Sequence, residues 1–248
     1  MPKLFRTSNA ALNARTFQNE QANGGAVMTL QGTVNKTGIL LIFTSAAAVW
    51  TWQMVSTDSP EAVYPWMFGG LIGGLIFALI TIYKKDIAPI TAPIYAALEG
   101  LALGGMSSLL NLRYPGIAIH AVELTFATLA AMLFAYSTGM IRATQKLRTG
   151  VIAATGAIAL VYLIDIGMSF FGMRVPLINE SGPLGILVSL VIVGVAALNL
   201  ILDFDFVESG VEQGAAKYME WYGAFGIMVT LIWLYVEMLR LMSKVRRR

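Results

Sequence analysis

The chain has 248 residues, of which 57% are hydrophobic and only 12% are charged, whereas a soluble domain carries about a quarter charged residues. With a mean hydropathy of +0.70, this composition excludes an ordinary soluble domain and indicates an integral membrane protein. The absence of cysteine excludes disulfides and thiolate metal sites. The net charge of +3 comes from basic residues in short loops and at the termini, a pattern typical of membrane orientation and not of nucleic-acid binding.

Residues 1–36 are polar and contain no apolar core. We therefore expect no secretory signal peptide here but a mobile cytoplasmic tail, with a short amphipathic surface helix around residues 4–17 as the alternative. Residues 37–243 are expected to form the transmembrane domain and residues 244–248 a basic C-terminal tail.

Seven apolar stretches are long enough to span a bilayer, because a spanning helix needs roughly 20 mostly apolar residues. They are residues 38–56, 65–83, 88–110, 117–140, 150–172, 183–204 and 221–242. The predicted fold class is an all-α membrane protein with seven transmembrane helices.

The loops between these spans predict the orientation. Five basic residues fall on the same side as the basic N-terminal tail: Lys84, Lys85, Arg142, Lys146 and Arg148. The positive-inside rule then places the N-terminus in the cytoplasm. Seven full spans leave the basic C-terminal tail on the outside, which the rule disfavours, so a re-entrant late segment and an inverted orientation remain alternatives.

Carboxylates within or at the edges of the spans are the candidate functional residues. They are Glu99, Glu123, Asp165, Asp203, Asp205 and Glu237. A carboxylate at bilayer depth costs about 2.5–3.5 kcal/mol on insertion scales, so it usually faces a protein interior, a partner or water. Only Arg113 and Arg240 lie near the same spans, which is too few bases to pair with every acid.

The depths of these acids predict a path. Glu123 and Asp165 fall in the outer half, Glu99 near the middle, and Asp203 and Asp205 at the inner end of the sixth span. A descending series of acids is what a cation or proton path requires. The alternative is that each acid is a hydrogen-bonded packing residue or reaches the membrane interface.

Polar neighbours at helical spacing support some of these acids. Asn199 stands four residues before Asp203, and Thr230 and Glu237 share a small and polar stripe on the last span. Two carboxyl groups in one dry site do not both ionise easily, so such a site responds to pH.

Several stretches resemble the Bax inhibitor-1 family, the transmembrane Bax inhibitor motif proteins. Residues 94–105 (IYAALEGLALGG) resemble its third-helix signature, and residues 197–206 (ALNLILDFDF) its sixth-helix motif, in which an acid ends an apolar run. Residues 28–37, 113–117 and 217–226 resemble the bacterial branch more closely. The resemblance implies a seven-helix bundle with the last helix central, in a bacterial inner membrane, that acts as a pH-sensitive calcium leak channel.

The family's pH sensor is a pair of aspartates, one ending the sixth helix and one in the seventh. The resemblance places the first at Asp203, with Asp205 as an alternative, and the second at Thr230, which cannot titrate. Asp205 or Glu237 are then alternative second acids. Glu99 matches the family's pore-lining acid. The resemblance therefore implies that calcium passes Glu99 and that the gate lies near Asp203. Both carboxylates would then contact calcium transiently.

The remaining candidates for the ion path are Asp165, Asn199, Glu123 and Glu237. Calcium is expected as the permeant ion and not as a cofactor, and no cofactor is expected. The expected partners are the lipid bilayer, calcium and protons, with no nucleic acid.

Other functional classes stay open. Ser107 and His120 faintly resemble the pair of an intramembrane serine protease, but a single histidine and a loose glycine-serine string are a weak signal. We therefore expect no enzyme. The stronger alternatives are a non-transporting modulator that binds another membrane protein, such as a membrane protease or a stress complex, and a calcium/proton exchanger.

Overall fold

The computed structural model describes residues 25–57, 60–173 and 175–247. The expectations of a mobile tail and of a surface helix at residues 4–17 fall mainly on residues 1–24, outside these ranges. Within the described ranges the regular secondary structure is helical, apart from one isolated antiparallel bridge between Val27 and Ala216.

The described part of the chain contains seven helices that are long and apolar enough to cross a membrane. They are α1 (Leu30–Thr57), α2 (Tyr64–Tyr83), α3 (Ala88–Arg113), α4 (Ile117–Ser137), α5 (Gln145–Ser169), α7 (Pro183–Glu212) and α8 (Met219–Arg246). Short helical turns η2 (Pro60–Val63), η3 (Lys85–Ile87) and α6 (Pro176–Asn179) lie in the connections. The predicted all-α membrane protein with seven spans is confirmed.

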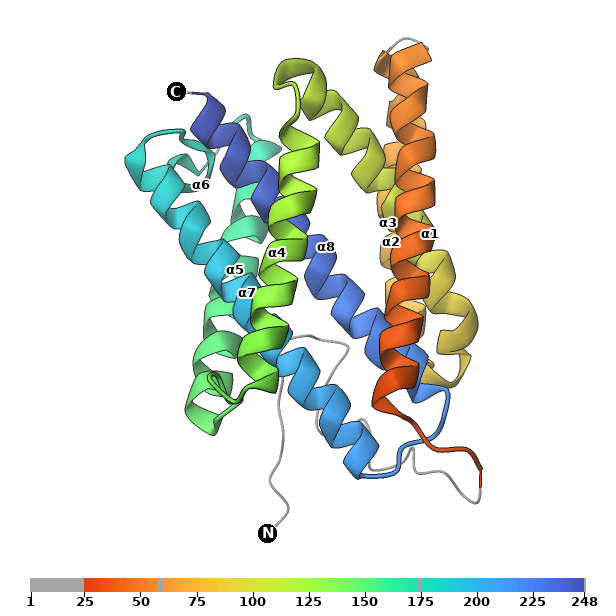
Figure 1. Ribbon diagram of the computed structural model, residues 1–248. Helices are drawn as coiled ribbons and strands as arrows, with labels where there is room; N and C mark the ends of the chain where they lie inside the picture. The colour runs from red at the N-terminus through yellow and green to blue at the C-terminus, as the bar shows by residue number, and fades with distance from the viewer. Residues whose placement is uncertain (1–24, 58–59, 174, 248) are drawn as a thin grey trace.

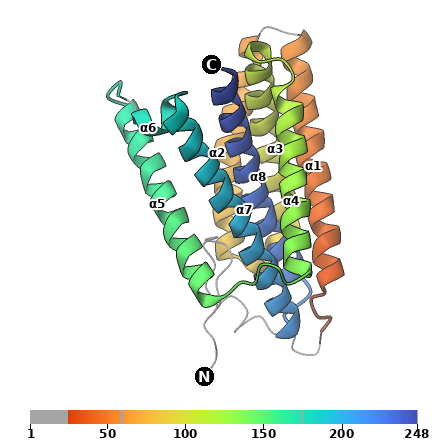
Figure 2. The same ribbon diagram turned by 60° about the vertical axis from the view of Figure 1, so that its left-hand side comes forward.

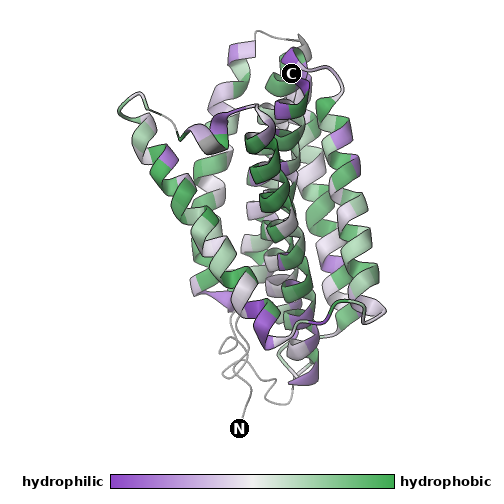
Figure 3. Ribbon diagram, turned by 90° about the vertical axis from the view of Figure 1, so that its left-hand side faces the viewer, coloured by the Kyte–Doolittle hydropathy of each residue, from purple (hydrophilic) through white to green (hydrophobic). Residues whose placement is uncertain are grey.

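The last helix is central. α8 packs against α1, α3, α4 and α7, and it is the most buried of the seven. In Figure 1 it crosses the bundle diagonally behind α1 and α4. α5 is the least buried helix and packs mainly against α7, so it stands at the edge of the bundle in Figure 2. Hydrophilic residues gather toward the two ends of the bundle, as Figure 3 shows.

The helices approach closely through small residues. An added Cβ at Gly100 or Gly104 on α3 would meet the backbone of α1 at Thr44 or Ala48. Thr44 also donates a hydrogen bond of 3.0 Å from its hydroxyl to the Ala96 carbonyl. In lipid, where no water drives apolar surfaces together, such close backbone contact stabilises helix pairs.

The helix ends differ from the predicted spans. α1 begins at Leu30 and not at residue 38, and α8 continues to Arg246. α7 continues to Glu212, past the predicted end at residue 204. Its last turns contain acidic residues, but Phe206, Val207 and Gly210 in the same turns are buried against the rest of the protein. We call the end of the bundle where α1 begins the lower end, as drawn in Figure 1, and the end where α8 finishes the upper end.

The chain crosses from one end to the other seven times, so α1 begins and α8 finishes at opposite ends (Figure 1). The re-entrant late segment considered above is therefore wrong. The turns that carry Lys84, Lys85, Arg142 and Lys146 share the lower end with the start of α1.

Candidate functional site

Asp203 lies on α7 at the contact with α8, and 0% of its surface is exposed. Thr230 on α8 is buried opposite it, and the Thr230 hydroxyl donates a hydrogen bond of 2.5 Å to Asp203 Oδ2. At about 1.5 Å per residue, about 14 Å of helix separates Asp203 from the end of α7. Asp203 therefore does not end its helix, and its carboxyl lies inside the bundle.

The α7–α8 contact around Asp203 is tightly packed. Ala196 and Ala197 on α7 and Ala224 on α8 are buried small residues. An added Cβ at Gly223 on α8 would lie 3.2 Å from the side chain of Val207 on α7. These small residues let the two helix backbones approach, and the approach covers Asp203 completely.

The charged groups further along α7 pair with neighbouring helices. Arg148 at the start of α5 donates to the Asp205 carboxylate, and the Tyr136 hydroxyl on α4 donates to Glu208. Asp205 is therefore bonded to α5, whereas the hydrogen bond between Asp203 and Thr230 links α7 to α8. Asp205 as the second acid of a pair with Asp203 stays a prediction.

Asn199 ties α7 to α5. Its amide Nδ2 donates one hydrogen bond of 2.9 Å to the Thr155 hydroxyl on α5 and another of 2.9 Å to the Val195 carbonyl. The expected role of Asn199 as a polar neighbour on the face of Asp203 is therefore replaced by a link between helices. Because α5 is otherwise little buried, this link and the Arg148–Asp205 pair hold its lower half on α7.

Glu237 is a fully partnered acid. It is 1% exposed, accepts a hydrogen bond of 2.7 Å from the Tyr162 hydroxyl on α5, and lies 3.3 Å from the Arg240 guanidinium. Arg240 in turn stacks over the Tyr162 ring at 4.5 Å from its centroid. The cluster joins α8 to α5 near the upper end, and it fits the packing alternative for Glu237 and not a second sensor acid.

Glu99 lies in a different helix contact. It is half-buried on α3 and faces α2, where an added Cβ at Gly74 would lie 2.6 Å from Glu99 Oε1. Gly74 therefore leaves the space that the carboxyl occupies. Since Glu99 belongs to the α2–α3 contact and Asp203 to the α7–α8 contact, the two do not form a shared calcium site here. The described residues hold no cluster of three metal-binding side chains.

Glu123 and Asp165 lie at the upper end with partners of their own. The Glu123 side chain is 66% exposed and lies 3.2 Å from His120 Nδ1. Asp165 accepts hydrogen bonds of 2.8 Å from the Val175 backbone and from the Asn179 amide, which fixes the connection from α5 to α6. The predicted descending series is therefore not one path in this structure, because its members lie in separate helix contacts.

Ser107 and His120 do not meet as a serine–histidine pair. The Ser107 hydroxyl lies 2.7 Å from the Tyr235 hydroxyl on α8, whereas His120 is paired with Glu123.

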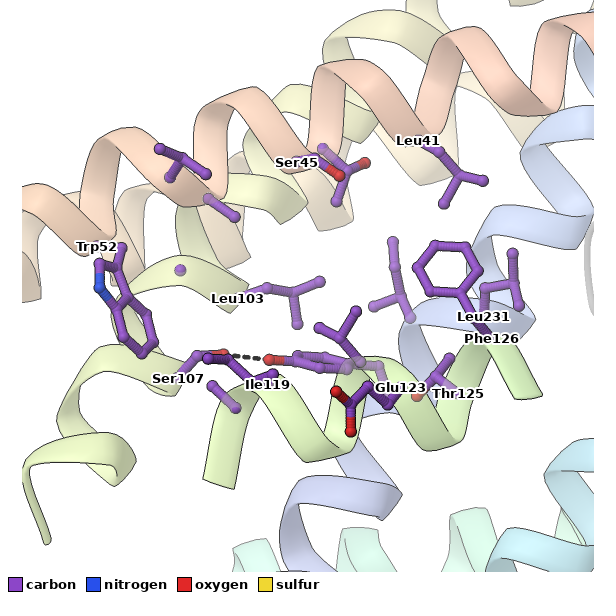
Figure 4. A pocket seen from close by; sticks show the side chains of 18 of the residues that line it. Leu41, Ser45, Trp52, Leu103, Ser107, Ile119, Glu123, Thr125, Phe126 and Leu231 are labelled. Carbon is purple, nitrogen blue, oxygen red and sulfur yellow. Dashed lines mark hydrogen bonds between the residues drawn. The ribbon is translucent and has the colours of Figure 1, made fainter. Parts of the chain in front are cut away.

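A cavity of about 500 Å³ lies between α1, α3, α4 and α8 (Figure 4). Its wall is mainly apolar, with the Ser107–Tyr235 hydrogen bond and Glu123 among its few polar groups. On α8 it is lined by Met228, Leu231, Ile232 and Tyr235, which lie on either side of Thr230 in the sequence, whereas Thr230 itself is bonded to Asp203 on α7. α8 therefore separates this cavity from Asp203.

Sequence reasoning missed a second buried acid, Glu220, at the lower end of α8. Glu220 is 0% exposed and lies 2.5 Å from the Lys36 ammonium and 2.7 Å from that of Lys217. It also accepts hydrogen bonds from the backbone and the hydroxyl of Thr29. Gly32 makes room, because a Cβ there would clash with the Glu220 carboxylate.

The Glu220 cluster joins two stretches that the family resemblance had already singled out, residues 28–37 and 217–226. Backbone hydrogen bonds also join the two stretches. The Met28 amide donates a hydrogen bond of 2.7 Å to the Ala215 carbonyl, and the Lys217 amide donates one of 3.0 Å to the Ala26 carbonyl. Opposite charges at the starts of α1 and α8 were the signal that would have found it.

A protein-family model described as Bax inhibitor 1 like matches residues 8–247. Neither a curated protein nor a solved structure matches the chain. The matched range includes every described helix and both members of the Asp203–Thr230 pair.

Proposed function

This chain belongs to the Bax inhibitor 1 like family, and on that premise we propose that it is a pH-sensitive calcium leak channel gated at the Asp203–Thr230 contact. The observation that carries the proposal is a carboxyl with no solvent exposure at the contact of α7 with the central helix, bonded across that contact by a neutral hydroxyl.

The proposed gate closes when Asp203 is neutral. A neutral Asp203 accepts the Thr230 hydrogen bond while α7 and α8 stay packed. An ionised carboxylate in the same dry contact costs several kcal/mol unless water or a cation compensates it. Thr230 supplies a hydrogen bond to Asp203 but no positive charge. Ionisation therefore favours a hydrated state in which α7 and α8 separate around Asp203.

The hydrated state is the conducting one in this proposal. An ionised Asp203 exposed to water attracts a divalent cation, because carboxylate oxygens are the ligands that Ca²⁺ prefers. Glu208 and Glu212 on the last turns of α7 add negative charge at the lower end, which raises the local cation concentration. Calcium flux is therefore expected to rise as pH rises.

The gate takes up a single proton, since Thr230 does not titrate. We place the channel in a bacterial inner membrane with the lower end toward the cytoplasm, following the basic residues at that end.

The proposal is tested with the purified full-length chain in sealed liposomes that contain a calcium dye. A leak follows the calcium gradient without moving protons in fixed proportion. Stoichiometric proton movement would identify an exchanger instead. Folded protein that carries no calcium at any pH would contradict the proposal and favour a modulator of another membrane protein.

A further inference from the structure

The upper end of the bundle contains a small basic pocket. Its volume is about 170 Å³, and it is formed by the end of α3, the turn that includes α6 and the last turns of α8. Four cations line it: Arg113, Arg240, Lys244 and Arg247. The described residues that line it include no carboxylate. Drug-sized ligands occupy about 300–1,000 Å³, so this pocket suits a smaller, negatively charged group.

Lys244 is the most deeply placed of these cations. It is 4% exposed, and its ammonium donates hydrogen bonds of 3.0 Å to the Gly185 carbonyl and 2.8 Å to the Ser189 hydroxyl. Both acceptors are neutral. Burying an ammonium against neutral groups leaves much of its desolvation uncompensated, and an anion in the adjoining pocket would supply the missing counter-charge.

The other three cations differ in whether their charge is already paired within the protein. Arg240 is paired with the buried Glu237, which cancels one of the four charges. Arg113 lies over the Tyr114 ring at 5.7 Å from its centroid, and Arg247 is exposed. The pocket therefore keeps the charges of Arg113, Lys244 and Arg247 for a ligand.

Ser181 gives a second and independent sign of a missing ligand. Its hydroxyl oxygen is buried in the pocket wall and has no hydrogen-bond partner among the described residues. Buried polar groups are nearly always paired. A hydroxyl beside several cations is suited to donate to an oxyanion.

We propose that this pocket binds a phosphate group, held by Arg113, Lys244 and Arg247 with a hydrogen bond from Ser181. The group is either the phosphodiester of an anionic lipid at the membrane surface or inorganic phosphate, since the two share the same charged oxygens. Basic pockets between transmembrane helices are known to hold lipid head groups. Binding also accounts for the basic end of α8, which the positive-inside rule alone leaves on the disfavoured side.

The test uses the full-length chain in a neutral detergent. Its thermal unfolding midpoint is measured during separate titrations with sodium phosphate, short-chain phosphatidylglycerol and short-chain phosphatidylcholine, with sodium chloride matching the ionic strength. We expect saturable stabilisation by phosphatidylglycerol, by phosphate, or by both. Phosphatidylglycerol alone would identify a lipid site, and phosphate alone a site for the free anion. Stabilisation by neither, or equally by phosphatidylcholine, would overturn the proposal.

Variants separate this pocket from general charge effects. Arg113→Gln and Ser181→Ala change exposed or small groups, and we expect the dissociation constant to rise about tenfold or more for Arg113→Gln. Lys146→Gln, at the opposite end of the bundle, is the matched control and should bind as the unmodified chain does. Unchanged binding in both pocket variants would contradict the assignment. Calcium flux plays no part in this readout, so either proposal can fail alone.

Discussion

The hydroxyl of Thr230 donates a hydrogen bond to the carboxyl of Asp203 across a contact between α7 and α8 that excludes solvent. Family resemblance implies a second aspartate at the position of Thr230, and in the structure this residue is hydrogen-bonded to Asp203. Because threonine does not titrate, the contact contains one proton-binding group from this pair where two were expected.

Replacing Thr230 by valine tests the hydrogen bond. Valine has nearly the same shape but no donor, so the closed contact loses the bond to Asp203 at a cost of about 1–3 kcal/mol. We expect a lower thermal unfolding midpoint and a higher calcium leak both below and above neutral pH. Thr230→Ser keeps the hydroxyl and serves as the control. A leak that Thr230→Val leaves unchanged would show that this bond does not hold the gate closed.

Replacing Thr230 by aspartate tests how many protons the gate binds. Two carboxyl groups within hydrogen-bonding distance do not ionise independently, and their titration separates into two steps. We expect the pH profile of calcium flux to broaden from a single step, with full flux reached only at higher pH. A profile that keeps the same single step in Thr230→Asp would argue against Asp203 as the proton-binding group.

Arg148→Gln tests the link between α5 and α7. It leaves Asp205 without its cation; the pair is only partly shielded, with the Asp205 side chain 23% exposed, so we expect a loss of about 1–3 kcal/mol in unfolding free energy. The double variant Arg148→Gln with Asp205→Asn should lose less than Arg148→Gln alone, because no unpaired charge remains. Equal losses would show that the pair adds nothing beyond packing.

Gly32→Ala tests the close approach at the lower end. A Cβ at Gly32 overlaps the Glu220 carboxylate, so the ion pairs with Lys36 and Lys217 must shift, and we expect a loss of about 1–3 kcal/mol. Gly38 lies on the same helix with open space around it. Gly38→Ala should therefore stabilise α1 by about 0.5–1 kcal/mol. Thermal unfolding of the two variants, compared side by side, checks the opposite signs.

The spans were predictable because length and hydropathy decide which segments cross a bilayer. The ends of the spans were predicted less well. Asp203 and Asp205 were expected to mark the inner end of the sixth span, whereas α7 continues to Glu212. Along these last turns Arg148 on α5 donates to Asp205, and Tyr136 on α4 donates to Glu208. A single sequence does not state which helices are neighbours.

The same reason limited the prediction of the site. Asp203 and Thr230 were identified by resemblance, and their contact is present. Glu99, Glu123 and Asp165 were expected on one path because the sequence indicates only the depth of each acid along its span. Depth does not determine which neighbouring helix a side chain contacts. Glu220 was missed because its partners lie at the start of α1, in a stretch interpreted as tail.

The most direct test of the account compares calcium flux in dye-loaded proteoliposomes at about pH 6 and about pH 8 for the unmodified chain and Asp203→Asn, since asparagine keeps the shape of Asp203 but cannot ionise. We expect greater flux at the higher pH for the unmodified chain, and a low flux that is the same at both pH values for Asp203→Asn. A flux in Asp203→Asn that keeps the full pH dependence would contradict it.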